Sequence, residues 1–266
     1  HIYPASWVYA KWYINPNTGT TSGHRMPLHF TPNYHQEQGM LMDFESGAYP
    51  WGRLFPNDHL LKMYDQAKDR RYQVFYKHTW HYNNPAGLPR GKKLGDPLVP
   101  VNQAQYLNLH PACTKYNDSY TRLRPDETQS FKDIIIYRLA ETYLMGAEAY
   151  YHLGKTDSLS YYYNKTWERA GNAKFTGTIT WDMIADEHAR ELALEGDRWF
   201  FLKRNGLLIE NIRKYGGEYI EKKGVVLMND TLIRENVQPH HVRLPIPQAQ
   251  IDIMGKENFP QNEGYN

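Results

Sequence analysis

The sequence predicts a mainly α-helical protein in which paired helices pack against a long, loop-rich region. Apolar residues recur at helical spacing between about residues 133 and 205, which favours packed helices. Residues 1–130 are instead interrupted throughout by Pro, Asn and Gly, which is typical of loops. Four of the seven Trp residues also fall in the first 80 residues, where helical patterning is weak. We therefore expect a loop-rich, aromatic-rich ligand side over 1–130 and a helical region with an irregular tail over 131–266.

The first two helices of the helical region are predicted to form an antiparallel pair. The first begins near Asp133 and ends at Gly154, and its apolar residues share one face: Ile136, Leu139, Ala140, Tyr143, Ala147, Tyr150 and Tyr151. Thr156-Asp157-Ser158 supplies a cap for the second, which ends at Gly171. Such a pair resembles one tetratricopeptide unit, and a lone unit leaves a helix face that another part of the protein must cover.

Further elements are predicted on either side of this pair. A third helix begins near Thr180, and a fourth ends at about Tyr215. Within the loop-rich part, Phe55-Pro56-Asn57-Asp58 is a start signal for a short amphipathic helix.

Composition excludes several classes of function. The chain carries 31 basic and 29 acidic side chains, a balance that argues against nucleic acid or a strongly anionic partner. Cys113 is the single cysteine, so an internal disulfide framework and a cysteine-based zinc site are ruled out. No apolar stretch is long enough to span a bilayer, and the start at His1 suggests a fragment or a processed chain.

Acidic side chains recur every four residues along the predicted third helix. They are interleaved with arginines, and the set comprises Glu187, Arg190, Glu191, Glu195 and Arg198. Stacked like charges on one helix face cost about 0.2–0.5 kcal/mol each, so partners are required. One interpretation is a semi-buried structural ion network, which the apolar stripe around these residues favours. The alternative is a pair of glycosidase carboxylates using Glu191 or Glu195.

Metal and cofactor sites are not predicted. An inverted zinc motif beginning at His188 would need a second His at position 192, which is Leu192. Nucleophile elbows, phosphate-binding loops and dinucleotide fingerprints are absent from the sequence. We therefore expect no catalytic residues, no metal ligands and no cofactor, and nothing in the sequence indicates a structural calcium.

Two aromatic segments, 7–15 and 76–84, mix Trp and Tyr with amide side chains. An aromatic ring can stack on the apolar face of a sugar, while amides bind its hydroxyls. The predicted stacking residues are Trp7, Trp12, Tyr13, Trp80 and Tyr82, and the predicted hydroxyl-binding residues are Asn15, Asn83 and Asn84. The alternative is that these rings fill space beneath long loops.

An ordered set of short motifs resembles the SusD/RagB family of Bacteroidetes outer-membrane lipoproteins. The matching segments are Gly52-Arg53-Leu54-Phe55-Pro56-Asn57, Asp69-Arg70-Arg71, Tyr137-Arg138-Leu139-Ala140-Glu141-Thr142-Tyr143-Leu144, Glu191-Leu192-Ala193-Leu194-Glu195-Gly196-Asp197-Arg198-Trp199, Pro245-Ile246-Pro247 and Gln261-Asn262-Glu263-Gly264-Tyr265. Glu187-His188 and Phe201 depart from the residues common in that family, so part of its polar network is expected to be rebuilt.

The resemblance implies a SusD-like α/α superhelical fold with tetratricopeptide-like helix pairs, and a glycan-binding protein rather than an enzyme. It further implies a surface-exposed outer-membrane lipoprotein, anchored through an amino-terminal lipid, that covers a SusC-like TonB-dependent transporter and delivers oligosaccharide to it. The family's chains are about twice as long, so we expect the amino-terminal half to be missing here. Two alternatives remain open: a module that only docks the transporter, and a glycoside hydrolase.

Overall fold

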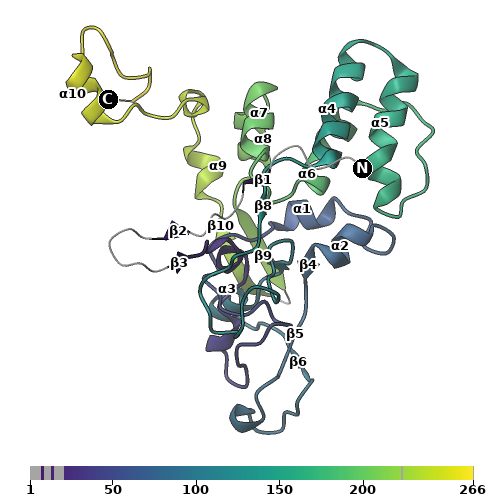
Figure 1. Cartoon of the computed structure of the whole chain (residues 1–266), viewed down its shortest axis with the longest axis vertical. Coiled ribbons are helices and arrows are strands. Elements are labelled where there is room, and N and C mark those ends of the chain that lie inside the picture. Colours follow the sequence, from purple (N-terminus) through teal and green to yellow (C-terminus); the bar gives the residue numbers. More distant parts are fainter. Residues whose placement is uncertain (1–6, 9–12, 15–20, 223, 266) are drawn as a thin grey trace. The chain divides into compact units, whose positions relative to one another are not determined.

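The computed structural model describes residues 7–8, 13–14, 21–222 and 224–265 (Figure 1). Its α-helices are α1 (Asp58–Lys62), α2 (Arg70–Val74), α3 (Gln103–Leu109), α4 (Leu139–His152), α5 (Thr156–Arg169), α6 (Trp181–Glu191), α7 (Arg198–Arg204), α8 (Leu208–Tyr215), α9 (Leu232–Asn236) and α10 (Gln248–Met254). Short 3-10 helices are η1 (Met26–Phe30), η2 (Tyr34–Gln36), η3 (Pro85–Gly87) and η4 (Pro239–Val242).

The strands are short and pair two by two. They are β1 (Trp7–Val8) with β8 (Ile134–Ile135), β2 (Tyr13–Ile14) with β3 (Thr21–Ser22), β4 (Tyr76–Lys77) with β7 (Ala112–Cys113), β5 (Trp80–His81) with β6 (Pro97–Leu98), and β9 (Glu218–Lys222) with β10 (Val225–Asp230). The mainly helical fold class predicted from the sequence is confirmed.

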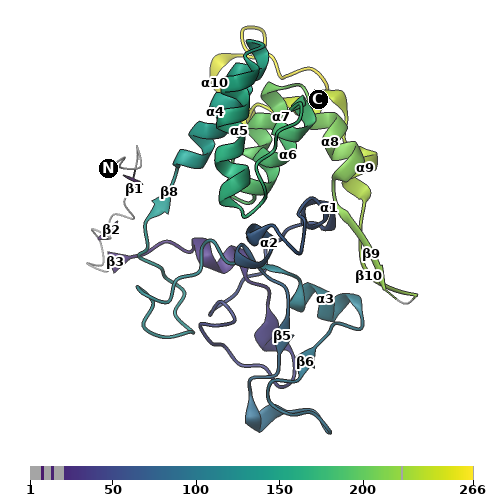
Figure 2. The ribbon, with the colours of Figure 1, turned by 90° about the vertical axis from the view of Figure 1, so that its right-hand side faces the viewer.

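The antiparallel helix pair predicted from periodicity is α4 and α5, which lie side by side in both views (Figures 1 and 2). Gly154 follows α4 with φ of 64°, a left-handed conformation that a residue with a Cβ rarely adopts, so the helix ends there. At the start of α6, the Thr180 hydroxyl accepts a hydrogen bond from the Met183 amide at 3.3 Å. Buried Ala147, Tyr163 and Ile184 join the three helices in one apolar cluster.

The expected start of the first helix near Asp133 is wrong. Ile134 and Ile135 form β8, and they pair antiparallel with Val8 and Trp7 respectively. Consecutive isoleucines favour an extended strand, and their pairing partner lies too far away in the sequence for local periodicity to reveal it. Helix α4 therefore begins at Leu139.

The loop-rich part has its own apolar core, although its elements are short. Buried Tyr34, Trp80, Leu98 and Leu109 form one cluster with Met40, Tyr82 and Ala112. Loop backbone groups are paired over long range, as where His24 and Ser130 exchange hydrogen bonds of 2.9 and 2.8 Å. Aromatic packing and these backbone bonds together hold an irregular chain in one conformation.

Residues group into two compact units: 1–198 with 221–227, and 199–220 with 228–266. The first unit holds the loop-rich part together with α4, α5 and α6. The residue 130 boundary predicted from the sequence therefore marks a change from loops to helices within this unit. In the second unit, Arg234 Nε donates to the Gly216 carbonyl at 2.5 Å and joins α9 to the end of α8. Gln261 bonds both backbone groups of Ile246 and ties the irregular tail together.

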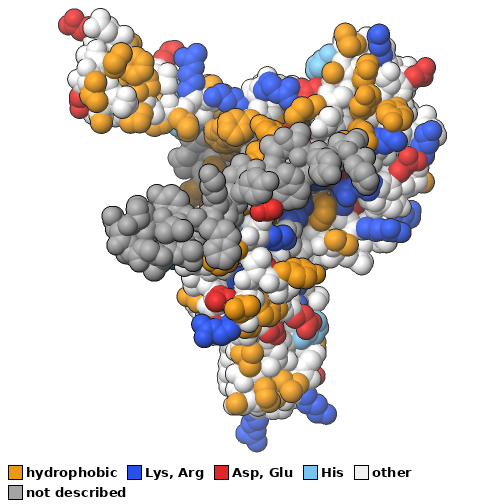
Figure 3. All heavy atoms as spheres, in the orientation of Figure 1, with side chains coloured by type: hydrophobic (Ala, Val, Ile, Leu, Met, Phe, Trp, Pro, Cys, Tyr) orange, Lys and Arg blue, Asp and Glu red, His pale blue; other side chains and the backbone are white. Residues whose placement is uncertain are grey.

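Within the described part of the chain, no helix combines the length and apolar character that a bilayer crossing requires. Figure 3 shows apolar, basic and acidic side chains interspersed over the visible face. The loop between β5 and β6 is strongly basic at its tip, where Arg90, Lys92 and Lys93 are exposed.

Candidate functional site

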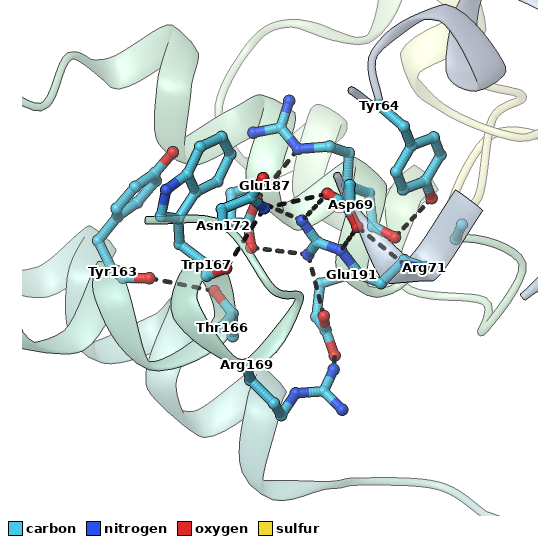
Figure 4. A network of polar contacts seen from close by, with 12 residues as sticks. Tyr64, Asp69, Arg71, Tyr163, Thr166, Trp167, Arg169, Asn172, Glu187 and Glu191 are labelled. Carbon is cyan, nitrogen blue, oxygen red and sulfur yellow. Dashed lines mark hydrogen bonds and ion pairs between the residues drawn. The ribbon is translucent and has the colours of Figure 1, made fainter. Parts of the chain in front are cut away.

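A buried ion network joins the loop-rich part of the first unit to α6 (Figure 4). Arg71 on α2 is its centre, and only 3% of its side chain is exposed. Its guanidinium donates to Asp69 at 2.9 and 2.7 Å and to Glu187 at 2.7 and 3.2 Å. It also reaches Glu191 at 3.0 Å, so three carboxylates share one cation. Such a bidentate arrangement has the geometry that an arginine fork matches best.

The network continues through Glu191 and Glu195 to a second arginine, Arg138. Its guanidinium donates to Glu195 at 2.6 and 2.8 Å and to Glu191 at 2.5 Å. Arg169 also pairs with Glu191. Lys115 Nζ donates to Glu195 at 2.5 Å and to two backbone carbonyls. Each buried charge thus has several partners, which offsets the cost of removing it from water.

Of the five charged residues predicted to form a structural network, Glu187, Arg190, Glu191 and Glu195 make ion pairs within the first unit. Arg198 donates to the Ala185 carbonyl at 2.8 Å. Helix α6 ends at Glu191 and α7 begins at Arg198, so the prediction that Glu195 and Arg198 lie on the same helix as Glu187 is wrong. Burial lowers the pKa of Arg198 to about 10. The partners Asp69, Arg71, Lys115, Arg138 and Arg169 come from other elements, and helix spacing alone could not reveal them.

The electrostatics of Glu191 do not suit a general acid. Burial would raise the pKa of its carboxyl, but the neighbouring Arg138 and Arg169 outweigh this effect and lower the pKa to about 2. A general acid needs a pKa near the working pH. The glycosidase interpretation of Glu191 therefore has no support from its surroundings.

The predicted sugar-binding residues of the first segment are only partly described. Trp7 lies in β1 and Tyr13 in β2, where the backbone of each is paired. Trp12 and Asn15 lie outside the described residues.

Trp80 and Tyr82 pack inside the loop-rich part, and only 2% and 8% of their surfaces are exposed. The Trp80 ring stacks on Tyr34, with centroids 5.0 Å apart and planes 18° apart. Because side chains alternate along a strand, Trp80 faces the core of the loops while His81 faces out. Burial of these two rings supports the space-filling alternative, and it does not support their prediction as sugar-stacking platforms.

The two predicted asparagines of the 76–84 segment, Asn83 and Asn84, fix the backbone around them. Asn83 accepts from the Leu41 amide at 2.8 Å and donates to the Leu41 carbonyl at 2.9 Å and to Asp43 at 2.5 Å. The Asn84 side chain accepts from the Ala86 amide at 3.1 Å and caps η3. Asn83 thereby brings the loop around Asp43 beside the end of β5.

This contact creates a polar pocket of about 280 Å³. We call it the Asn83 pocket, and it is lined by Asp43, Glu45, Ser46, Lys77, His81, Tyr82, Asn83 and Gly95. The side chains of Glu45 and His81 have no hydrogen-bonding partner among the described residues, so they are available to a ligand. Sequence reasoning selected Tyr82 and Asn83 but missed Asp43 and Glu45, which lie about 40 residues away.

A second cavity of about 340 Å³ lies beside β8, between Phe75, Ile134 and Arg138. Of its basic groups, Lys115 and Arg138 are bound to Glu195 and Arg169 pairs with Glu191. Lys132 donates to the Asn117 carbonyl, so little hydrogen-bonding capacity remains for a ligand. Across the part of the chain that is described, no three His, Cys, Asp or Glu side chains are grouped so that they could hold a metal ion.

The structure thus combines a helical-hairpin scaffold with a loop surface whose pocket offers charged and polar side chains, the arrangement of a binding protein. The sequence matches the SusD family over residues 7–265, and the chain belongs to that family. This confirms the resemblance drawn from the short motifs. SusD family proteins are non-catalytic, carbohydrate-binding proteins of Bacteroidetes polysaccharide utilisation.

Individual relatives agree with this assignment. The chain is 37% identical over 133 residues to the starch-binding protein SusD of Bacteroides thetaiotaomicron, a match that covers 50% of this chain and 22% of that protein. A SusD superfamily structure from Parabacteroides distasonis has a TM-score of 0.60 and 18% identity, covering 97% of this chain and 49% of that one.

Surface glycan-binding protein A from Bacteroides thetaiotaomicron, solved in complex with laminarihexaose, has a TM-score of 0.56 and 20% identity. That match covers 97% of this chain and 51% of the other. The chain thus spans about half the length of these solved relatives. At such identities the structural matches establish the shared fold.

Proposed function

We propose that this chain is the part of a cell-surface protein that binds a glycan without cleaving it and passes it to a TonB-dependent transporter. The observation that carries the proposal is the match to the SusD family along residues 7–265. A likeness in fold to a glycan-binding protein solved with laminarihexaose supports the same class of ligand. Attachment to the outer membrane through an amino-terminal lipid, and docking on a SusC-like transporter, belong to this proposal.

The Asn83 pocket is our proposed glycan subsite in this chain. Its volume is slightly below the roughly 300 Å³ at which pockets for drug-sized ligands begin, so it suits one unit of a longer glycan. Glu45 can accept hydrogen bonds from sugar hydroxyls, and His81 and Lys77 can donate to them. Tyr82 and Asn83 form its wall, while residues of the 7–15 segment remain candidates for ring stacking.

Exposed hydrogen bonds of this kind contribute about 0.5–1.5 kcal/mol each, so the affinity should be weak, on the order of micromolar to millimolar. Weak binding suits a protein that must release its ligand to a channel. The proposed function therefore does not need a deep, enclosed site.

Titration of the chain with a panel of glycans, with the heat of binding measured by calorimetry, tests the proposal. We expect saturable binding of at least one glycan with no change in its length by chromatography. Glu45→Ala with His81→Ala should weaken that binding about tenfold. Lys92→Ala with Lys93→Ala, on the exposed β5–β6 loop, is the matched control and should change it less than twofold. Absence of binding across the panel, or release of shortened products, would contradict the proposal.

A further inference from the structure

Two arginines and one histidine surround Trp51 on the surface of the first unit. The guanidinium carbon of Arg53 lies 4.6 Å from the centroid of the Trp51 ring, and that of Arg25 lies 5.5 Å from it. The His29 ring meets the indole edge-on, with centroids 5.0 Å apart. Trp51 and His29 are half-buried, while both arginine side chains are exposed. We call Arg25, His29, Trp51 and Arg53 the Trp51 platform.

The backbone holds the platform in place. The Trp51 amide donates to Leu28 at 2.6 Å, and the Arg53 amide donates to His29 at 3.0 Å, so the chain after residue 50 is fixed along η1. Gly52, with φ of 60°, allows this close approach, because a Cβ there would lie 3.3 Å from Pro32 Cα. The two arginines are therefore presented from a rigid backbone.

Neither guanidinium has a carboxylate partner among the described residues, and both lie over the Trp51 ring. The sequence explains why, since the first acidic residue of the chain is Glu37 and residues 46–57 contain no Asp or Glu. Both segments that build the platform thus lack acidic side chains. The two positive charges lie 4.6 and 5.5 Å from one ring centroid, so an anion bound by either guanidinium is also attracted by the other.

Stacking on an indole occupies the flat face of a guanidinium and leaves its N–H groups free at the edge. Those groups match the two oxygens of a carboxylate or a sulfate bidentately. Because Trp51 already orders both side chains, less conformational entropy is lost when a ligand binds.

We infer that the Trp51 platform binds the acidic group of an anionic glycan, a carboxylate or a sulfate ester. This inference rests on the proposed glycan-binding function and names the class of sugar that the protein takes. The near balance of charge over the whole chain hides this local excess of positive charge.

The test is titration of the chain with three soluble polymers: polygalacturonate for the carboxylate, a sulfated galactan for the sulfate, and pullulan as a neutral glucan. We expect wild-type protein to bind at least one anionic polymer, with an affinity that falls as salt is raised. Which of the two polymers binds identifies the acidic group. Arg25→Gln with Arg53→Gln should lower that affinity at least tenfold.

Lys92→Gln with Lys93→Gln removes the same number of positive charges from the exposed β5–β6 loop and should change affinity less than twofold. Arg25→Lys with Arg53→Lys keeps the charge but loses the bidentate fork, so it should bind with intermediate affinity. Unchanged thermal midpoints would exclude misfolding as the cause. If the glutamine variant does unfold, the affinity of the Arg25→Lys with Arg53→Lys variant tests the inference in its place.

Equal losses in the platform and loop variants would overturn the inference, because binding would then follow net charge alone. Binding of pullulan without either anionic polymer would overturn it while leaving the proposed function standing. If the protein bound none of the three polymers and no glycan of a wider panel, both the inference and the proposed function would be contradicted.

Discussion

Arg71 and Glu187 lie 116 residues apart in the sequence and form a buried, two-pronged ion pair, with N–O distances of 2.7 and 3.2 Å. Arg71 belongs to the loop-rich part of the first unit, whereas Glu187 belongs to the helical scaffold. The same guanidinium holds Asp69 and Glu191. One side chain therefore joins the loop-rich part, which carries our proposed glycan subsite, to the helices of the first unit.

Arg71→Met should lower the free energy of unfolding by about 3–5 kcal/mol, because it leaves Glu187 and Glu191 buried without their shared cation. Urea denaturation followed by circular dichroism measures this change. Arg70→Met alters the exposed neighbour on the same helix and should cost less than about 0.5 kcal/mol. Equal stability of the two variants would show that Arg71 does not hold the network together.

Glu191 should make stability fall in acid. Its folded pKa of about 2 is below the unfolded value, so its stabilising contribution is complete above pH 4.5 and is lost as the pH falls toward 2. For a carboxylate this deeply buried, the contribution is on the order of 3 kcal/mol.

Glu191→Gln measures the same contribution directly. The difference in unfolding free energy between wild type and this variant should be largest at neutral pH and should shrink between pH 4.5 and 2. A difference that stays constant over this range would mean that the ionised form of Glu191 is not the stabilising one.

Glu141 should behave in the opposite way. Burial, together with Asp197 and Glu195 nearby, raises the pKa of its carboxyl to about 7. The folded protein therefore favours the protonated form, and ionisation costs stability progressively as the pH rises from 4.5 to above 7. Glu141→Gln should stabilise the protein by about 1–2 kcal/mol at pH 8 and have no effect at pH 4.

Thermal denaturation of the Glu141 variant at the two pH values is the measurement. Glu168→Gln, an exposed carboxyl on α5, serves as its control and should leave stability nearly unchanged at both. Destabilisation by Glu141→Gln at pH 8 would contradict the raised pKa.

Apolar spacing and the terminal Gly154 were sufficient to predict that α4 and α5 form a hairpin, because both signals depend only on neighbouring residues. The predicted cap at Thr156-Asp157-Ser158 is wrong, since Thr156 is the first residue of α5 and the N-cap, Lys155, makes no side-chain capping bond. They failed for Ile134 and Ile135, whose strand partners lie near the start of the chain. Motif resemblance picked out Arg71, but no local rule could assign its partners on α6. The net charge of the whole chain likewise gave no sign of the local positive charge at Arg25 and Arg53, because the acidic residues that balance them lie elsewhere in the sequence.

The aromatic segment 76–84 shows why composition alone could not locate a sugar site. Tryptophan in irregular sequence fits an exposed platform and a plug beneath loops equally well, and strand alternation between Trp80 and His81 decides between them. The polar residues that complete the Asn83 pocket come from the loop around Asp43, which only the folded chain brings close.

Trp80 is the residue whose replacement best separates packing from binding. Trp80→Ala should lower the free energy of unfolding by about 3–5 kcal/mol, because it leaves a cavity beside Tyr34. Trp80→Phe should cost less, since it keeps a ring and removes an indole N–H that is buried without an acceptor among the described residues.

His81→Ala, on the outward face of the same strand, is the matched control, and its stability should stay within about 0.5 kcal/mol of wild type. Urea denaturation of the same three variants gives their free energies of unfolding, and glycan titration gives their affinities. If Trp80→Ala kept its stability but lost glycan binding, the ring would have to reach the ligand and its assignment to the core would be wrong. If Trp80→Ala lost stability while His81→Ala weakened binding alone, Trp80 would support the loop surface from within and the ligand would contact the outward side chains.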